Sequence, residues 1–265
     1  MKIEVKGNQV NYQLEGPHSA PVLMLSHALA TNLTLWDLQV DALIRDFRIL
    51  RYDTMGHGGS DVPRGPYTLD DLARQAGDLL DLLGIGQVHF LGLSLGGMIG
   101  QTLALKRPEC LASLSLCGTT SRIPAEAQPL WQERISIAES EGMEPLVEPT
   151  LARWFTPSFR AARADRFDRV RGMIRTTAPL GYSSCCRAIA IFDLTARIHE
   201  IKVPTMILVG EEDQGMPAAM SRAIQERISG SELVTIPSAS HLSNMEQPEA
   251  FNRTVIAFLN RTLGK

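Results

Sequence analysis

One serine in this sequence stands in a setting that suits a nucleophile. Ser94 lies in the run G-L-S-L-G-G, residues 92–97, between an apolar strand-like stretch at 88–93 and a helix-forming stretch at 98–105. Glycines beside it allow a sharp turn, because they lack a Cβ and tolerate a positive φ. A serine in such a strand–turn–helix unit projects its hydroxyl beyond the sheet edge, at the amide end of a helix. The sequence therefore predicts a nucleophilic serine at this turn.

Other glycine-rich loops after strands bind phosphate or only turn the chain. A Walker-type phosphate loop has a lysine after its glycines, and Met98 stands there in this chain. A dinucleotide-binding loop has the pattern G-x-G-x-x-G and an acidic residue about 20 positions later. The serine between glycines favours nucleophilic catalysis, and the rest of the chain must supply its partners.

A serine hydroxyl becomes an effective nucleophile when a base removes its proton and an acid orients the base. Asp213 follows the apolar run 203–209, and His241 follows the last such run, 233–236. Both residues therefore come after strand ends, where ligands bind in open α/β sheets. Ser94, Asp213 and His241 are predicted to form a catalytic triad.

Each partner has an alternative in the sequence. Glu211 and Glu212 could supply the acid in place of Asp213, although the turn that ends at Pro217 suits the aspartate best. His27 and His57 could compete as the base, because they also follow predicted strands. They precede the serine, however, and the order serine, acid, histidine would then be broken.

The tetrahedral intermediate of acyl transfer needs backbone N–H donors for its oxyanion. Leu95 supplies one donor at the helix start, and Leu29, in the loop after the early strand, is the best-placed second donor. Four further side chains are candidates for the pocket wall: His27, Trp131, Trp154 and Ile189. The alternative for Trp131, Trp154 and Ile189 is that they only pack one layer of helices against the core.

The order of elements predicts the fold class. Apolar runs alternate with amphipathic stretches, which is typical of an α/β protein with a mostly parallel sheet and helices on both faces. Residues 121–197 lack strand-like runs, and helical stretches occupy 127–140, 145–154, 160–176 and 182–196. We therefore expect a core domain of residues 1–120 and 198–265, with a helical lid, or cap, formed by residues 121–197.

Composition limits the partners. The 265 residues are 44% hydrophobic and 21% charged, with a formal net charge of −3, which argues against nucleic acid or an anionic membrane. No apolar run reaches the roughly 20 residues of a membrane span, and the first residues do not resemble a secretion signal. The four cysteines show no metal-ligand spacing. We expect a cytoplasmic protein that binds a small molecule and no metal; its oligomeric state stays open, with a homodimer as one option.

Several motifs carry a resemblance to a known family over nearly the whole chain. They are R-Y-D-T-M-G-H-G-G-S at 51–60, G-P-Y-T at 65–68, H-F-L-G-L-S-L-G-G-M-I-G-Q at 89–101, R-W-F-T-P at 153–157, G-Y-S-S-C-C at 181–186 and H-L-S-N-M-E-Q-P-E at 241–249. With these motifs the chain resembles the α/β-hydrolases of the 3-oxoadipate enol-lactonase-like group. The resemblance implies an α/β-hydrolase fold, a triad of Ser94, Asp213 and His241, and no cofactor. It also implies a carboxylic ester hydrolase, a lactonase or esterase that works through an acyl-enzyme.

One departure from the group concerns the substrate. An Arg–Asp pair usually follows the two cysteines, where this chain has Ala190 and Ile191. An enol-lactone of a dicarboxylic acid carries a free carboxylate, for which arginine is the natural partner. Arg187, about one helical turn earlier, could replace the missing arginine, so Arg187 and Ala190 are two further candidates for the pocket wall. Without it, the pocket would be more apolar than in the group, which favours a neutral ester or lactone, with a carboxylesterase of neutral short-chain esters as the alternative function. Perhydrolysis, carbon–carbon bond hydrolysis and a non-catalytic ligand receptor also remain open, as do acyl-chain length and enantioselectivity.

Overall fold

The structure is a computed structural model and describes residues 1–264. These residues form an eight-stranded sheet in the order β1-β2-β4-β3-β5-β6-β7-β8. Strand β2 pairs antiparallel with β1 and β4, and every other pair is parallel. The strands are β1 (Lys2–Val5), β2 (Asn8–Glu15), β3 (Val22–Ser26), β4 (Arg48–Tyr52), β5 (Val88–Leu93), β6 (Leu111–Cys117), β7 (Thr205–Gly210) and β8 (Glu232–Ile236). The predicted mostly parallel α/β sheet is confirmed.

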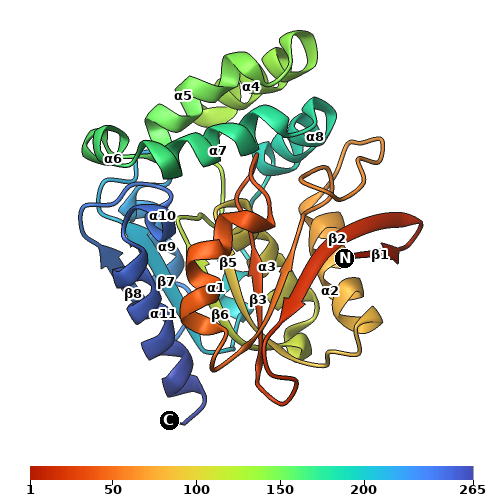
Figure 1. Ribbon diagram of the computed structural model, residues 1–265, viewed down its shortest axis with the longest axis vertical. Coiled ribbons are helices and arrows are strands. Elements are labelled where there is room, and N and C mark those ends of the chain that lie inside the picture. Colours follow the sequence, from red (N-terminus) through yellow and green to blue (C-terminus); the bar gives the residue numbers. More distant parts are fainter. Residues whose placement is uncertain (265) are drawn as a thin grey trace.

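Helices cover both faces of the sheet. Figure 1 shows α1 and α11 side by side in front of the sheet, with α2 and α3 packed together behind it. This burial explains why β5 is apolar at almost every position, since all six of its residues are buried. The helices outside the segment between β6 and β7 are α1 (Asp37–Leu43), α2 (Leu69–Leu82), α3 (Leu95–Lys106), α9 (Ala218–Gln225), α10 (Ser243–Glu246) and α11 (Pro248–Thr262). Single 3-10 turns lie at Leu33–Trp36, Pro108–Cys110, Ala125–Ala127 and Ile198–Glu200.

The chain between β6 and β7 is helical. Its helices are α4 (Gln128–Glu141), α5 (Glu144–Trp154), α6 (Pro157–Ala162), α7 (Ala164–Thr176) and α8 (Pro179–Ala190). They form a layer above one end of the sheet in Figure 1, apart from the helices that flank its faces. The division into a core (residues 1–120 and 198–265) and a cap (residues 121–197) stays a prediction. The last residue of the predicted core, Lys265, lies outside the described residues.

The structure corrects the predicted helix at 160–176. The chain bends at Arg163, whose φ is −133° and ψ is 57°, and this bend separates α6 from α7. Phe159 of α6 stacks on Phe155 with ring centroids 5.1 Å apart, and Phe167 of α7 packs edge-on against the same ring at 5.7 Å. Two short helices can bring both rings to Phe155, whereas one straight helix would carry them apart.

The structure also corrects the predicted helix at 182–196, which ends at Ala190. After this point the chain pairs with the segment that leaves β6. The Ile123 N–H donates to the Phe192 carbonyl at 2.8 Å, and an antiparallel bridge follows at Asp193. This long-range pairing replaces helical hydrogen bonds, so sequence periodicity could not reveal it.

Candidate active site

Ser94 occupies a strained turn between β5 and α3. Its backbone has φ 57° and ψ −112°, a conformation that L-residues rarely adopt. The neighbouring glycines make the turn possible, because a Cβ on Gly92 would lie 2.2 Å from the Gly96 carbonyl oxygen. A Cβ on Gly96 would in turn lie 2.1 Å from the Ser26 carbonyl oxygen. The fold thus fixes the serine at the end of β5 and directly before the first turn of a helix.

Asp213 and His241 meet at the ends of β7 and β8. The His241 Nδ1–H donates to Asp213 Oδ2 at 2.8 Å, and both side chains are buried. The other carboxylate oxygen, Oδ1, accepts from the Gly215 and Met216 N–H groups, each at 2.8 Å. Asp213 is therefore held from both sides and fixes the orientation of the imidazole. Glu211 and Glu212 make no hydrogen bond to His241 among residues 1–264.

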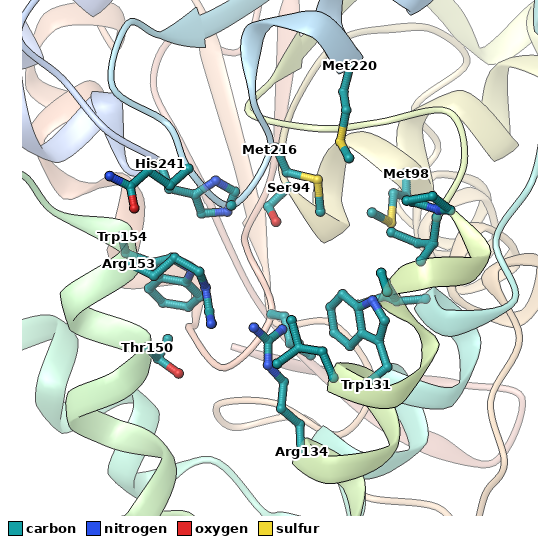
Figure 2. Close-up of a pocket in the computed structure, with 18 of the residues that line it drawn as sticks. Ser94, Met98, Trp131, Arg134, Thr150, Arg153, Trp154, Met216, Met220 and His241 are labelled. Atoms are coloured by element: carbon teal, nitrogen blue, oxygen red, sulfur yellow. The ribbon is translucent and has the colours of Figure 1, made fainter.

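Ser94 and His241 line the same cavity, as Figure 2 shows. Asp213 occupies Nδ1 of His241, so Nε2, on the other side of the ring, is the nitrogen left to act as the base. Trp154 packs against this imidazole with ring centroids 5.7 Å apart. The arrangement brings a serine, a histidine and an aspartate together at one edge of the sheet.

Two backbone N–H groups at the cavity have no partner. Leu95 is the first residue of α3, and Leu29 lies in the loop after β3; both residues are buried. Within residues 1–264, no group accepts a hydrogen bond from either N–H. Leu29 lines the cavity together with Ser94, and Leu95 directly follows the serine, so these two free N–H groups are candidate donors to an oxygen anion.

The histidines that precede the serine have structural partners. His57 Nε2 accepts the Ala30 N–H at 3.0 Å, and His27 Nε2 accepts the Thr54 N–H at 2.9 Å. Burial lowers the pKa of both rings, that of His57 to about 3, with the neighbouring His27 as the second cause. Both side chains are therefore neutral acceptors that hold the Leu29 loop. His27 does not line the cavity, which corrects its assignment as a pocket residue.

The cavity has a volume of about 140 Å³ and a mostly apolar wall. Three predicted pocket residues line it: Trp131, Trp154 and Ile189. Two others do not. Arg187 points away and pairs with Glu139, with Nη1–Oε1 at 2.7 Å, and its side chain is 39% exposed. Ala190 ends α8, where its carbonyl accepts a hydrogen bond from Gln128. The structure thus corrects both assignments, because a helix position alone does not determine which side faces the cavity.

Two arginines that the sequence interpretation missed line the cavity. Figure 2 shows Arg134 on α4 and Arg153 on α5 beside it. The Arg134 guanidinium carbon lies 4.8 Å from the centroid of the Trp131 ring. Burial, and then the nearby Arg134 charge, lowers the pKa of Arg153 to about 10, so this side chain still carries its charge at neutral pH.

These two arginines differ from others on the same helical layer. Five of their neighbours form ion pairs with carboxylates: Arg163, Arg169, Arg171, Arg175 and Arg187. Arg134 and Arg153 pair with no carboxylate among residues 1–264. Arg153 belongs to the R-W-F-T-P run, and Arg134 follows Trp131 by one helical turn, but neither position reveals from sequence that its partner is absent.

Within residues 1–264, no group of three or more His, Cys, Asp or Glu side chains is arranged to hold a metal ion. Over the same range, no helix is both long and apolar enough to cross a membrane.

Comparisons with known proteins agree with this architecture. A family model described as alpha/beta hydrolase fold matches residues 21–248. A 3-oxoadipate enol-lactonase of Acinetobacter baylyi is 35% identical over 95% of this chain and 93% of its own length. The crystal structure of the enol-lactonase from Burkholderia xenovorans superimposes with a TM-score of 0.95 and 37% identity, over 98% of this chain and 100% of that one. A malate-bound thermophilic esterase from Thermogutta terrifontis gives 0.92 and 29%, over 99% and 98%.

The chain belongs to the α/β-hydrolase family. Within that family it is similar to 3-oxoadipate enol-lactonases, so the resemblance found from its motifs is confirmed. The prediction of a carboxylic ester hydrolase is confirmed at the level of this enzyme class.

Proposed function

We propose that the protein hydrolyses a small carboxylate-bearing lactone, with 3-oxoadipate enol-lactone as the best candidate, through an acyl-enzyme on Ser94. The hydrogen bond between His241 and Asp213, in a cavity that Ser94 shares, supports the serine mechanism. The observation that carries the substrate class is the pair Arg134 and Arg153, which line that cavity with no carboxylate partner among residues 1–264. The names of the similar enol-lactonases favour the same substrate.

In the proposed mechanism, Ser94 Oγ attacks the lactone carbonyl carbon while His241 Nε2 accepts the hydroxyl proton. Asp213 stabilises the imidazolium that forms. The N–H groups of Leu29 and Leu95 donate to the oxyanion of the tetrahedral intermediate. When the ring C–O bond breaks, His241 returns the proton to the leaving oxygen, which stays attached to the acyl group.

Water completes the reaction. It attacks the acyl carbon as His241 takes one of its protons, and the second tetrahedral intermediate collapses to a carboxylic acid. The proton on His241 passes to Ser94 Oγ, which restores the free serine. One water molecule is consumed for each ring that opens, and both oxygen atoms of the former ester remain in a single product.

The arginine pair offers a recognition site for the carboxylate at the far end of such a substrate. A guanidinium binds a carboxylate through charge-assisted hydrogen bonds, which are stronger than neutral ones. Burial of Arg153 strengthens this attraction, because the local dielectric is lower than in water. The arginines of α4 and α5 would then replace the pair that the enol-lactonase-like group carries after its two cysteines. The similar esterase from Thermogutta terrifontis is described as malate bound, so that relative takes a dicarboxylate ligand.

The cap and the cellular location complete the proposal. We propose that residues 121–197 act as a cap that supplies the substrate-binding wall, since Trp131, Arg134, Arg153 and Trp154 all lie in this segment and line the cavity. The cytoplasmic location inferred from the sequence remains part of the proposal.

A substrate comparison tests the proposal. We expect wild-type kcat/KM to be highest for 3-oxoadipate enol-lactone, lower for an uncharged enol-lactone and lowest for p-nitrophenyl acetate. Arg153→Met should raise KM for the carboxylated lactone roughly 10- to 100-fold, the worth of a hydrogen bond to a charged group. The same variant should change p-nitrophenyl acetate hydrolysis less than about threefold. Arg187→Met, which removes an arginine outside the cavity, is the matched control.

Equal losses on charged and neutral substrates in Arg153→Met would contradict the carboxylate site. A wild-type preference for uncharged substrates would instead support a hydrolase of neutral esters, which the methionines and Trp131 of the cavity wall would also suit.

A further inference from the structure

Glu246 is a buried carboxylate that the proposed mechanism does not use. It is the last residue of α10, five positions after His241, and its side chain lies between the active-site loop and the helical layer. Oε1 accepts hydrogen bonds from the Thr156 N–H and the Thr156 hydroxyl, both at 2.8 Å. Oε2 accepts the N–H of Ser240. One carboxylate therefore joins Ser240 and Thr156, which lie 84 positions apart in the sequence.

The two joined segments both belong to the active site. Ser240 directly precedes His241, whereas Thr156 follows Trp154, which packs on the His241 ring and lines the cavity. Further contacts run alongside the carboxylate. The Leu242 N–H donates to the Trp154 carbonyl at 3.3 Å, and the Ser240 hydroxyl lies 3.3 Å from the carbonyl of Arg153. The loop of the base and the wall of the pocket are thus connected directly.

The Glu246 carboxylate is buried and surrounded by hydrogen-bond donors. Burial raises the pKa of Glu246, while its hydrogen bonds from Ser240 and Thr156 act in the opposite direction. A carboxylate only accepts hydrogen bonds, so it suits the three donors that surround it here. A glutamine has the same shape but can accept through one oxygen only, and its NH₂ group would face a donor on the other side.

We propose that Glu246 is a positioning residue that couples the placement of His241 to the substrate-binding wall formed by Arg153 and Trp154. Its contacts with Ser240 and Thr156, here called the Glu246 bridge, hold both segments at a fixed separation. A shift of the substrate-binding wall would then move the His241 base relative to Ser94, and a shift of His241 would move the wall. The inference rests on the proposed function, because it assigns catalysis to His241.

The test compares Glu246→Gln with Glu249→Gln, which makes the same chemical change at an exposed position three residues later. Active sites are first counted by stoichiometric reaction with an activated phosphonate, so that unfolded protein does not enter the rate. We expect Glu246→Gln to lower kcat per active site about 10- to 100-fold, since small misplacements of a catalytic group cost this much. KM for the carboxylated lactone should rise in the same variant, and Glu249→Gln should match the wild type in both parameters.

A second pair of variants decides the matter if Glu246→Gln does not fold. Thr156→Val removes one donor of the bridge, whereas Thr156→Ser keeps the hydroxyl. We expect Thr156→Val to lower kcat and raise KM together, and Thr156→Ser to restore both toward wild type. The Thr156 hydroxyl also caps α6 by accepting the Phe159 N–H at 3.2 Å, so a loss of stability alone would not support the bridge.

Unchanged kcat and KM per active site in Glu246→Gln, or in Thr156→Val when the first variant does not fold, would overturn the coupling and leave Glu246 with a purely structural role. Failure of the proposed function would look different. In that case the wild-type protein itself would neither react with the phosphonate nor hydrolyse any ester or lactone.

Discussion

Acid should destabilise this protein through His57, and the structure sets the size of the effect. The ring is buried, donates to the Met55 carbonyl through Nδ1 and accepts the Ala30 N–H through Nε2, so its neutral form fits the folded state. Burial is the main reason that its pKa falls from 6.5 to about 3. Below pH 6.5 the unfolded chain takes up a proton at this position that the folded chain does not. Stability is therefore lost as the pH falls from about 6.5 toward 3.

The magnitude follows from the difference between the two pKa values. At pH 5 the unfolded histidine is protonated and the folded one is not, and a gap of 1.5 pH units below 6.5 corresponds to about 2 kcal/mol. His57→Gln removes the titrating group and keeps a side-chain acceptor for the Ala30 N–H. Between pH 7 and pH 5, the free energy of unfolding should thus fall about 2 kcal/mol less in this variant than in the wild type.

Urea unfolding followed by tryptophan fluorescence at pH 7, 6 and 5 measures this difference. The other groups that titrate in this range are present in both proteins and cancel in the comparison, except His27, whose ring lies 5.5 Å from that of His57 and acts on its pKa. His18→Gln makes the same substitution at an exposed histidine and serves as the control. Equal slopes for His57→Gln and the wild type would refute the assignment of His57 as a neutral buried acceptor.

Three further changes have defined outcomes. Ser94→Ala should abolish hydrolysis of p-nitrophenyl acetate while the far-UV circular dichroism stays unchanged; residual turnover at the wild-type rate would exclude the serine mechanism. Asp213→Asn should lower kcat roughly 10³- to 10⁴-fold, measured by stopped-flow ester hydrolysis, because the imidazole loses the partner that fixes its tautomer; a loss below tenfold would argue for another acid. Gly96→Ala should destabilise the fold by about 1–3 kcal/mol in urea unfolding, since its Cβ would lie 2.1 Å from the Ser26 carbonyl oxygen; wild-type stability would mean that the turn relaxes easily.

Much of the fold could be predicted from the sequence because its signals are local. Strand β5 and the turn at Ser94 follow from a buried apolar run that ends in glycines. The helical boundaries at Arg163 and Ala190 could not be predicted in this way. The first depends on two rings that meet Phe155, and the second on backbone pairing with a segment about 70 residues earlier.

In the pocket, too, the sequence predicts what depends on local signals and not what depends on contacts between distant segments. The order of Ser94, Asp213 and His241 can be read from the sequence, since each follows a strand whose end lies at one edge of the sheet. Arginine roles cannot be read in this way, because they depend on whether a carboxylate lies nearby in space. Arg187 forms an ion pair with Glu139 and lies outside the pocket, whereas Arg153 forms no ion pair among residues 1–264 and lines it.

The central claim is that Ser94 carries the acyl group, and one measurement tests it directly. The protein is incubated with a fluorophosphonate, and digestion with mass spectrometry then locates the adduct while esterase activity is followed on the same samples. We predict one adduct for each chain, on Ser94, with activity lost in proportion to labelling. Loss of activity with Ser94 unmodified, or full activity with Ser94 labelled, would contradict the account.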